Sequence, residues 1–166
     1  MKVYSYQITI AICLVIWISG CAGGISREVR SQVNYAGSFT QLQQDPETYT
    51  GRTVLLGGKI INVEVLNNLT DIFVLQLELD GNDRPQNNDQ SNGRFIVRSP
   101  KFLDPAIYPQ GTLITVVGKV TGSEEKLIGQ MPYKYPVIEP LEIKKWIPES
   151  DQSPRFHFGI GVGTTF

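Results

Sequence analysis

The sequence holds one histidine and two cysteines in 166 residues, so the side chains that most often carry catalysis or bind transition metals are scarce. Acyl transfer needs a nucleophile with a positioned base, usually histidine. His157 instead lies near the carboxyl terminus between two phenylalanines. Zinc sites are built from cysteine and histidine, which argues against zinc here. We expect no catalytic residue, no cofactor and no metal site.

Acidic groupings that could replace histidine are few. Glu124 and Glu125 are adjacent in a predicted hairpin turn, which favours two hydrated carboxylates over an acid/base pair. Asp80, Asn82 and Asp83 offer oxygen ligands, but their segment lacks the sixth-position glycine and the distant glutamate of an EF-hand loop. A plain surface loop is the expected structure of this segment.

A basic stretch is also missing. The whole chain has a net charge of −1, and residues 38–148 carry eleven Lys and Arg against thirteen Asp and Glu. A groove for nucleic acid is normally basic, because it must offset phosphate charge. Nucleic acid is therefore excluded as a partner.

The amino terminus is where the informative pattern lies. Residues 8–18 are apolar except for Thr9, which is typical of the core of a secretory signal. Small residues at Ser19 and Gly20 then precede Cys21, whose thiolate can accept a lipid. This arrangement resembles the lipobox of bacterial lipoproteins, in which the cysteine is acylated and becomes the first residue. The alternative is an uncleaved membrane helix, although only about half of the ~20 residues it needs are strongly apolar.

Cleavage before Cys21 would leave 146 residues, the usual size of one domain. Cys13 would leave with the signal, so the mature domain must fold without disulfides. One acyl chain binds a bilayer only reversibly, and the resemblance to lipoproteins implies three. In that family an aspartate after the cysteine signals retention at the inner membrane. Ala22 therefore points to the outer membrane.

The rest of the chain predicts an all-β, mainly antiparallel domain: a small OB-like barrel of five or six strands with one short N-terminal helix. Ser38 is a predicted N-cap for a helix over 39–44, and Phe39, Leu42 and Tyr49 are spaced to close a barrel end. Strands are predicted at 53–65, 72–79, 95–97, 113–121 and 133–146.

Finer features of these strands also follow from the pattern. Gly57 and Gly58 predict a bulge or sharp bend. Residues 80–92 predict a long mobile surface loop, 100–105 a turn with a buried Phe102–Leu103 pair, and 123–126 a hairpin turn. In the last strand Val137, Leu141 and Ile143 share one face, and Pro136 and Pro140 place it at an edge or a barrel opening.

Several short motifs in order resemble the Slp family of outer-membrane lipoproteins. They are Tyr49-Thr50-Gly51, Gly57-Gly58-Lys59-Ile60, Gly93-Arg94-Phe95, Phe102-Leu103-Asp104-Pro105, the run 115–122, the run 128–137 and Trp146. The resemblance covers roughly residues 38–147 besides the lipobox. It implies a lipid-anchored envelope protein that faces the periplasm and has no established catalytic activity.

Two surfaces are candidates for partners. Tyr108, Tyr133, Tyr135 and Trp146 either form a platform for a neutral glycan or peptide or pack at the barrel ends. The C-terminal tail alternates apolar and small residues and ends in Phe166, like the last strand of an outer-membrane barrel. One strand cannot span a bilayer alone. Engagement of an envelope protein, docking on this domain and disorder of the tail all remain open.

The predicted organisation has four parts: a signal peptide with lipobox at 1–20, a lipidated tether at 21–37, the barrel at 38–148 and a Gly/aromatic tail at 149–166. The predicted function is that of a non-enzymatic outer-membrane lipoprotein, anchored by acylated Cys21 and facing the periplasm, with a structural or interaction role. The alternative is an anchored periplasmic module that binds a neutral glycan, a peptide or a partner strand.

Overall fold

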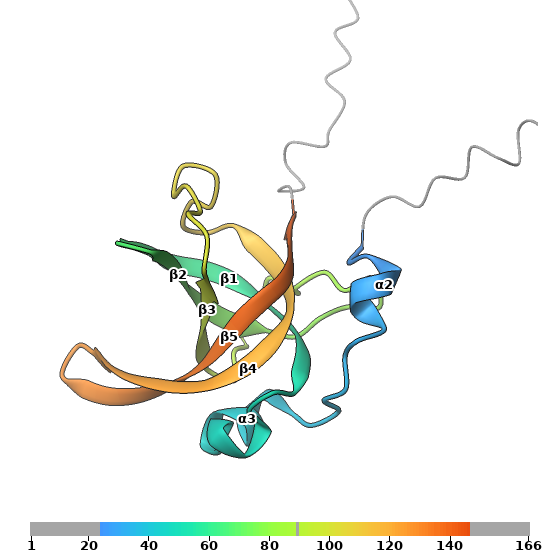
Figure 1. Ribbon diagram of the computed structural model, residues 1–166, viewed down its shortest axis with the longest axis horizontal. Coiled ribbons are helices and arrows are strands. Elements are labelled where there is room, and N and C mark those ends of the chain that lie inside the picture. The colour runs from blue at the N-terminus through green and yellow to red at the C-terminus, as the bar shows by residue number, and fades with distance from the viewer. Residues whose placement is uncertain (1–23, 89, 147–166) are drawn as a thin grey trace, which may run out of the picture.

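A computed structural model describes residues 24–88 and 90–146 (Figure 1). Five strands close into a barrel in the order β1-β2-β3-β5-β4, with all neighbours antiparallel except β3 and β5. The prediction of a small, mainly antiparallel OB-like barrel is confirmed. The elements are α2 (Arg27–Arg30), α3 (Phe39–Gln44), the 3₁₀ helix η1 (Pro46–Tyr49), β1 (Thr53–Leu66), β2 (Leu69–Leu77), β3 (Arg94–Ser99), β4 (Leu113–Ile128) and β5 (Met131–Trp146).

Helix α3 begins at the predicted cap and closes one end of the barrel (Figure 1). The Ser38 hydroxyl accepts the N–H of Gln41 at 3.3 Å, and the Gln41 amide oxygen accepts the N–H of Ser38 at 2.9 Å. This capping box satisfies two helix-end donors at once. Phe39 and Leu42 are buried in the barrel core and Tyr49 packs against it, as predicted.

The barrel interior is filled by one apolar cluster contributed by all five strands and α3. Its buried members are Phe39, Leu42, Val54, Leu56, Ile60, Ile72, Val74, Phe95, Val97, Ile114, Val116, Val120 and Ile138. The interior is therefore a packed core and not a ligand cavity.

The glycine pair of β1 lies where this strand has a hydrogen-bonded neighbour on each side. Gly57 and Gly58 pair with β2 on one side and β4 on the other, in unbroken register. A Cβ on Gly58 would lie 2.3 Å from the carbonyl oxygen of Leu75, so close backbone approach explains that glycine. The bulge expected at the pair occurs instead between Ile60 and Asn62.

The predicted hairpin turn at 123–126 is wrong. Strand β4 runs on to Ile128, and the chain reverses at Gly129, which has a φ of 63°, and Gln130. The polar residues 123–126 suggested a turn, but they lie on a part of β4 that extends beyond the barrel. There, two of their charged side chains meet partners on β1 and β3, as shown below.

The β4–β5 pairing has two bulges, and the one at Leu141 on β5 breaks the predicted face of that strand. Ile143 packs against the barrel core, Val137 belongs to a second cluster, and Leu141 is 42% exposed at a bulge. Within the closed barrel β5 has neighbours on both sides, so it is not an edge strand. Its parallel pairing with β3 covers only Val137 and Ile138, and Pro136 precedes this short segment directly.

Two loop predictions also need correction. Phe102 is 69% exposed, so no buried Phe-Leu pair exists, although Leu103 packs against the core and donates its N–H to the Thr70 hydroxyl at 3.1 Å. The 80–92 segment is held to the barrel in its first half. Asp83 is buried, and its carbonyl accepts the Thr115 hydroxyl at 2.5 Å.

The segment before α3 contacts the barrel and does not hang free. Ile25 is 7% exposed, and Asn34 pairs with Thr53 through its side-chain oxygen, which accepts the Thr53 N–H at 2.9 Å. Arg30 forms an ion pair with Asp83. A tether that lets the domain stand away from the bilayer was expected over this segment, but from Ile25 onward the chain is docked. Among the described residues, no helix is long and apolar enough to cross a membrane.

Candidate functional site

The β4–β5 hairpin folds over the outer face of β1, β2 and β3. It forms a second apolar cluster there, with Phe73, Ile96, Tyr135 and Val137 buried and Ile61, Ile128 and Tyr133 packed around them. Phe73 and Tyr135 meet edge to face, with ring centroids 5.7 Å apart. In OB barrels the face of strands 2 and 3 often receives the ligand. In this protein a large part of that face is covered by the chain itself.

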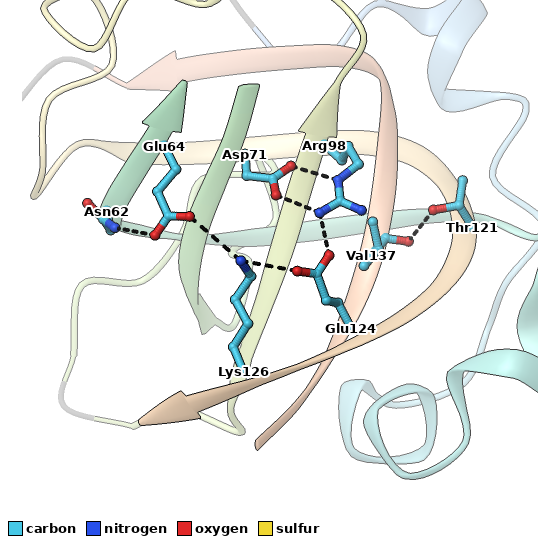
Figure 2. Close-up of polar contacts among 8 residues, drawn as sticks. All are labelled: Asn62, Glu64, Asp71, Arg98, Thr121, Glu124, Lys126 and Val137. Atoms are coloured by element: carbon cyan, nitrogen blue, oxygen red, sulfur yellow. Dashed lines mark hydrogen bonds and ion pairs between the residues drawn. The ribbon is translucent and has the colours of Figure 1, made fainter. Parts of the chain in front are cut away.

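A chain of charges crosses the same interface (Figure 2). The guanidinium of Arg98 on β3 donates to both carboxylate oxygens of Asp71 on β2, at 2.8 and 2.6 Å, and also contacts Glu124 on β4. The ammonium of Lys126 lies 3.1 Å from Glu124 and 3.6 Å from Glu64 on β1. Asp71 has no exposed surface, so its charge depends on Arg98 for compensation.

The electrostatics of this network favour fixed charges over proton transfer. Hydrogen bonding to Asp71 raises the pKa of Arg98 despite partial burial. Burial would raise the pKa of Glu124, but hydrogen bonds and charges from Arg98 and Lys126 outweigh it and lower that pKa. The Glu124 hydrogen bond raises the pKa of Lys126. All three side chains therefore stay ionised at neutral pH.

Sequence reasoning missed this network because it assigned Glu124 to a hydrated turn. A usable signal was present: single charges of opposite sign interrupt otherwise apolar strand segments at Asp71 and Arg98. Paired charges on neighbouring strands are a common way to keep such positions satisfied. Glu125, by contrast, is exposed as expected.

The four aromatic residues proposed as a platform do not come together. Tyr135, on the hairpin itself, is buried against the barrel, and the ring of Tyr133 lies beside the ring of Tyr135 with centroids 4.7 Å apart. The Tyr133 hydroxyl accepts the Arg94 N–H at 2.7 Å, and burial raises the pKa of Tyr133. These two tyrosines stabilise the hairpin and offer little surface to a ligand.

Tyr108 and Trp146 lie at the other end of β5. The ring of Tyr108 packs against the barrel core, with the Lys145 ammonium 5.0 Å from its centroid. The indole N–H of Trp146 donates to the Thr115 hydroxyl at 2.9 Å, and Arg84 lies 5.5 Å from its ring centroid. Of the four, Trp146 borders an open hollow.

That hollow has a volume of about 1120 Å³ and lies between the loop 80–87, the turn 106–112 and the end of β5. Its lining mixes amide, charged and apolar side chains, among them Asp80, Gln86, Asn87, Ile107, Gln110 and Lys145. The Lys145 ammonium donates to the carbonyl of Ile107 at 3.0 Å, which ties two of its walls together.

The oxygen ligands suggested at 80–83 have other partners. One carboxylate oxygen of Asp80 accepts the N–H groups of Asn82 and Arg84, at 2.8 and 2.9 Å, and the Asp83 carboxylate pairs with Arg30. Within 24–88 and 90–146 no three metal-binding side chains gather in one place. Cys21, His157 and the C-terminal tail lie outside the described residues.

Comparison with known proteins gives a consistent result. The model of the family described as "Outer membrane lipoprotein Slp family" matches residues 18–160. The uncharacterized lipoprotein YeaY of Escherichia coli is 29% identical over 153 residues, 88% of this chain and 79% of that protein. An uncharacterized protein of Haemophilus influenzae is 35% identical over 137 residues, 80% and 72% of the two chains. The outer membrane protein Slp of Escherichia coli is 30% identical over 118 residues, 70% and 61%. No solved structure matches significantly.

Proposed function

The chain belongs to the outer membrane lipoprotein Slp family, and from this membership we propose that Cys21 carries the lipid that anchors it, with the barrel in the periplasm. Its role there is non-enzymatic: the anchored barrel supports or contacts other components of the envelope. The observation that carries this proposal is the sequence Ile18-Ser19-Gly20-Cys21 at the end of an apolar signal.

A lipid anchor of this kind is energetically sufficient. Each buried methylene contributes ~0.8 kcal/mol, and two or more acyl chains are needed for stable attachment. No part of the barrel then has to enter the bilayer. The non-enzymatic role is supported by the packed interior and by the ion pairs that hold Glu124 in its ionised form.

The test is the intact mass of the protein purified from membranes. We expect a chain that begins at residue 21 and carries acyl mass. Cys21→Ser should remove that mass and release the protein from the membrane fraction. Cys13→Ser is the matched control, because that cysteine lies inside the signal and its loss should leave processing unchanged. An unprocessed Cys21→Ser protein that stays as firmly bound would instead identify the amino-terminal helix as the anchor.

A second role, binding of a neutral glycan or a peptide, is favoured by the hollow beside Trp146. The other tryptophan, Trp17, belongs to the predicted signal, so Trp146 is the one tryptophan of the mature chain, and it lies at this hollow. Titration with N-acetylglucosamine oligomers or short peptides should shift Trp146 emission. Gln110→Ala should weaken that shift, whereas Gln130→Ala, in the distant β4–β5 turn, should not. A flat titration with every probe would remove this second role.

A further inference from the structure

The docked part of the chain begins very close to the proposed lipid. Ile25 is 7% exposed, and Ser26 donates its N–H and its hydroxyl to the Glu142 carboxylate near the end of β5, at 3.1 and 2.6 Å. Further along, Arg30 pairs with Asp83. The chain is therefore attached to the barrel from its fifth mature residue onward.

The chain between the acylated cysteine and the docked barrel is therefore very short. Ile25 is four positions after Cys21, and an extended chain spans at most 3.3–3.6 Å per residue, or about 14 Å over this distance. A free tether over all of 21–37 would have reached about 55 Å on the same basis. Because acyl chains enter the hydrocarbon, Cys21 must lie at headgroup level, and Ile25 must lie within about 14 Å of it.

We infer that the barrel lies directly against the lipid leaflet, with its α2 face toward the phospholipid headgroups and the β4–β5 turn pointing away. The α2 face comprises Ser26–Arg30, Asp83 and Glu142. Figure 1 shows α2 on the opposite side of the molecule from that turn. The inference rests on the proposed acylation of Cys21, and it adds the surface that meets the lipid.

The chemistry around the α2 face suits a headgroup layer. Thr115 donates to the carbonyl of Asp83 and accepts the indole N–H of Trp146, so Trp146 lies beside this face. The cationic groups of Arg84 and Lys144 lie 5.5 and 5.8 Å from the centroid of its ring. Tryptophan and basic side chains are the residues that proteins place at the membrane–water interface.

The same orientation leaves the opposite end free for periplasmic contacts. Leu127 and Met131, next to the β4–β5 turn, are 69% and 72% exposed. These apolar side chains would face away from the lipid that could otherwise cover them.

The orientation can be measured with single thiol labels on the acylated protein in vesicles. Acylation blocks Cys21, and the mature chain has no other cysteine, so Glu28→Cys and Gln130→Cys each give one labelling site. Both positions are exposed. A fluorophore at each is quenched by spin-labelled headgroups in phosphatidylethanolamine–phosphatidylglycerol vesicles. We expect quenching several-fold stronger at position 28 than at position 130.

An insertion of twelve Gly and Ser residues between Gly24 and Ile25 is the control. It should keep the protein on the vesicles while removing the difference between the two labels. Equal quenching at both positions of the uninserted protein, or stronger quenching at position 130, would overturn the inference while leaving the anchor intact. Natural protein that is purified from membranes and binds vesicles without carrying acyl mass would overturn the proposed anchor as well.

Discussion

Arg98 and Asp71 form a two-pronged ion pair across neighbouring strands, with nitrogen–oxygen distances of 2.8 and 2.6 Å, and Asp71 has no exposed surface. The pair lies where the β4–β5 hairpin covers the barrel, and Glu124 of that hairpin binds the same guanidinium (Figure 2). One arginine thus compensates a buried charge and attaches the hairpin.

Replacing Arg98 alone should destabilise the protein strongly. Arg98→Met leaves the Asp71 carboxylate buried and uncompensated, and removing one partner of such a pair costs about 3–5 kcal/mol. Chemical denaturation monitored by Trp146 fluorescence measures the loss. Lys126→Met, whose partners are partly exposed, should cost about 1 kcal/mol or less.

The double variant Asp71→Leu/Arg98→Met should recover much of the stability that Arg98→Met loses. Apolar residues of similar volume often replace a buried ion pair at little cost. If the double variant were as unstable as Arg98→Met, the uncompensated Asp71 charge would not be the cause of the loss.

Acid should weaken the hairpin contact through Glu124. Its pKa is lower in the folded protein than its ordinary value of 4.5, so the ionised form stabilises the fold above pH 4.5. That contribution is lost as the pH falls from 4.5 through the lower folded pKa. In urea titrations across this range, Glu124→Gln should show a smaller loss of stability than the natural protein. Glu125→Gln, at an exposed position, should keep the natural slope.

Gly58→Ala should destabilise the barrel by about 1–3 kcal/mol or more, as overpacking does. The added methyl would lie 2.3 Å from the backbone oxygen of Leu75, and backbone cannot rotate away as a side chain can. Gly81→Ala is the control, because nothing lies within 4 Å of its added methyl. Equal unfolding midpoints for the two variants would contradict the close approach of β1 and β2.

Leu42→Ala should cost about 2–5 kcal/mol, the usual range for emptying a buried leucine site. Leu42 has no exposed surface and fills the end of the barrel from α3. Leu127→Ala removes the same atoms from a side chain that is 69% exposed, and it should change the free energy of unfolding by about 0.5 kcal/mol or less. Thermal unfolding of the two variants measures the difference.

The sequence was most informative where local chemistry decides the structure. The cap at Ser38 and the proline after Asp45 define α3 without help from distant residues, and the helix has the predicted bounds. The apolar strands also indicated the barrel, because five strands in one small domain have few ways to bury their apolar faces.

The errors arose where distant contacts decide. The local sequence of residues 123–126 predicts a turn. In the structure Glu124 and Lys126 are on a strand, where Arg98 pairs with Glu124 and Glu64 pairs with Lys126. The bulge at Leu141 moves the following side chains to the other face of β5. The sequence of β5 alone does not predict that bulge. The docking of residues 25–35 likewise depends on Glu142 and Thr53, far along the chain.

The parallel pairing of β3 with β5 bears on the order of folding. The hairpins β1–β2 and β4–β5 join neighbours in the chain, so they can form early, whereas β1–β4 and β3–β5 must each close a long loop. In the β3–β5 pairing, two residue pairs, Ile96 with Val137 and Val97 with Ile138, offset the entropy cost of closing that loop. Ile96 and Val137 also belong to the second apolar cluster, so the overlapping hairpin covers and stabilises the β3–β5 pairing from outside the barrel.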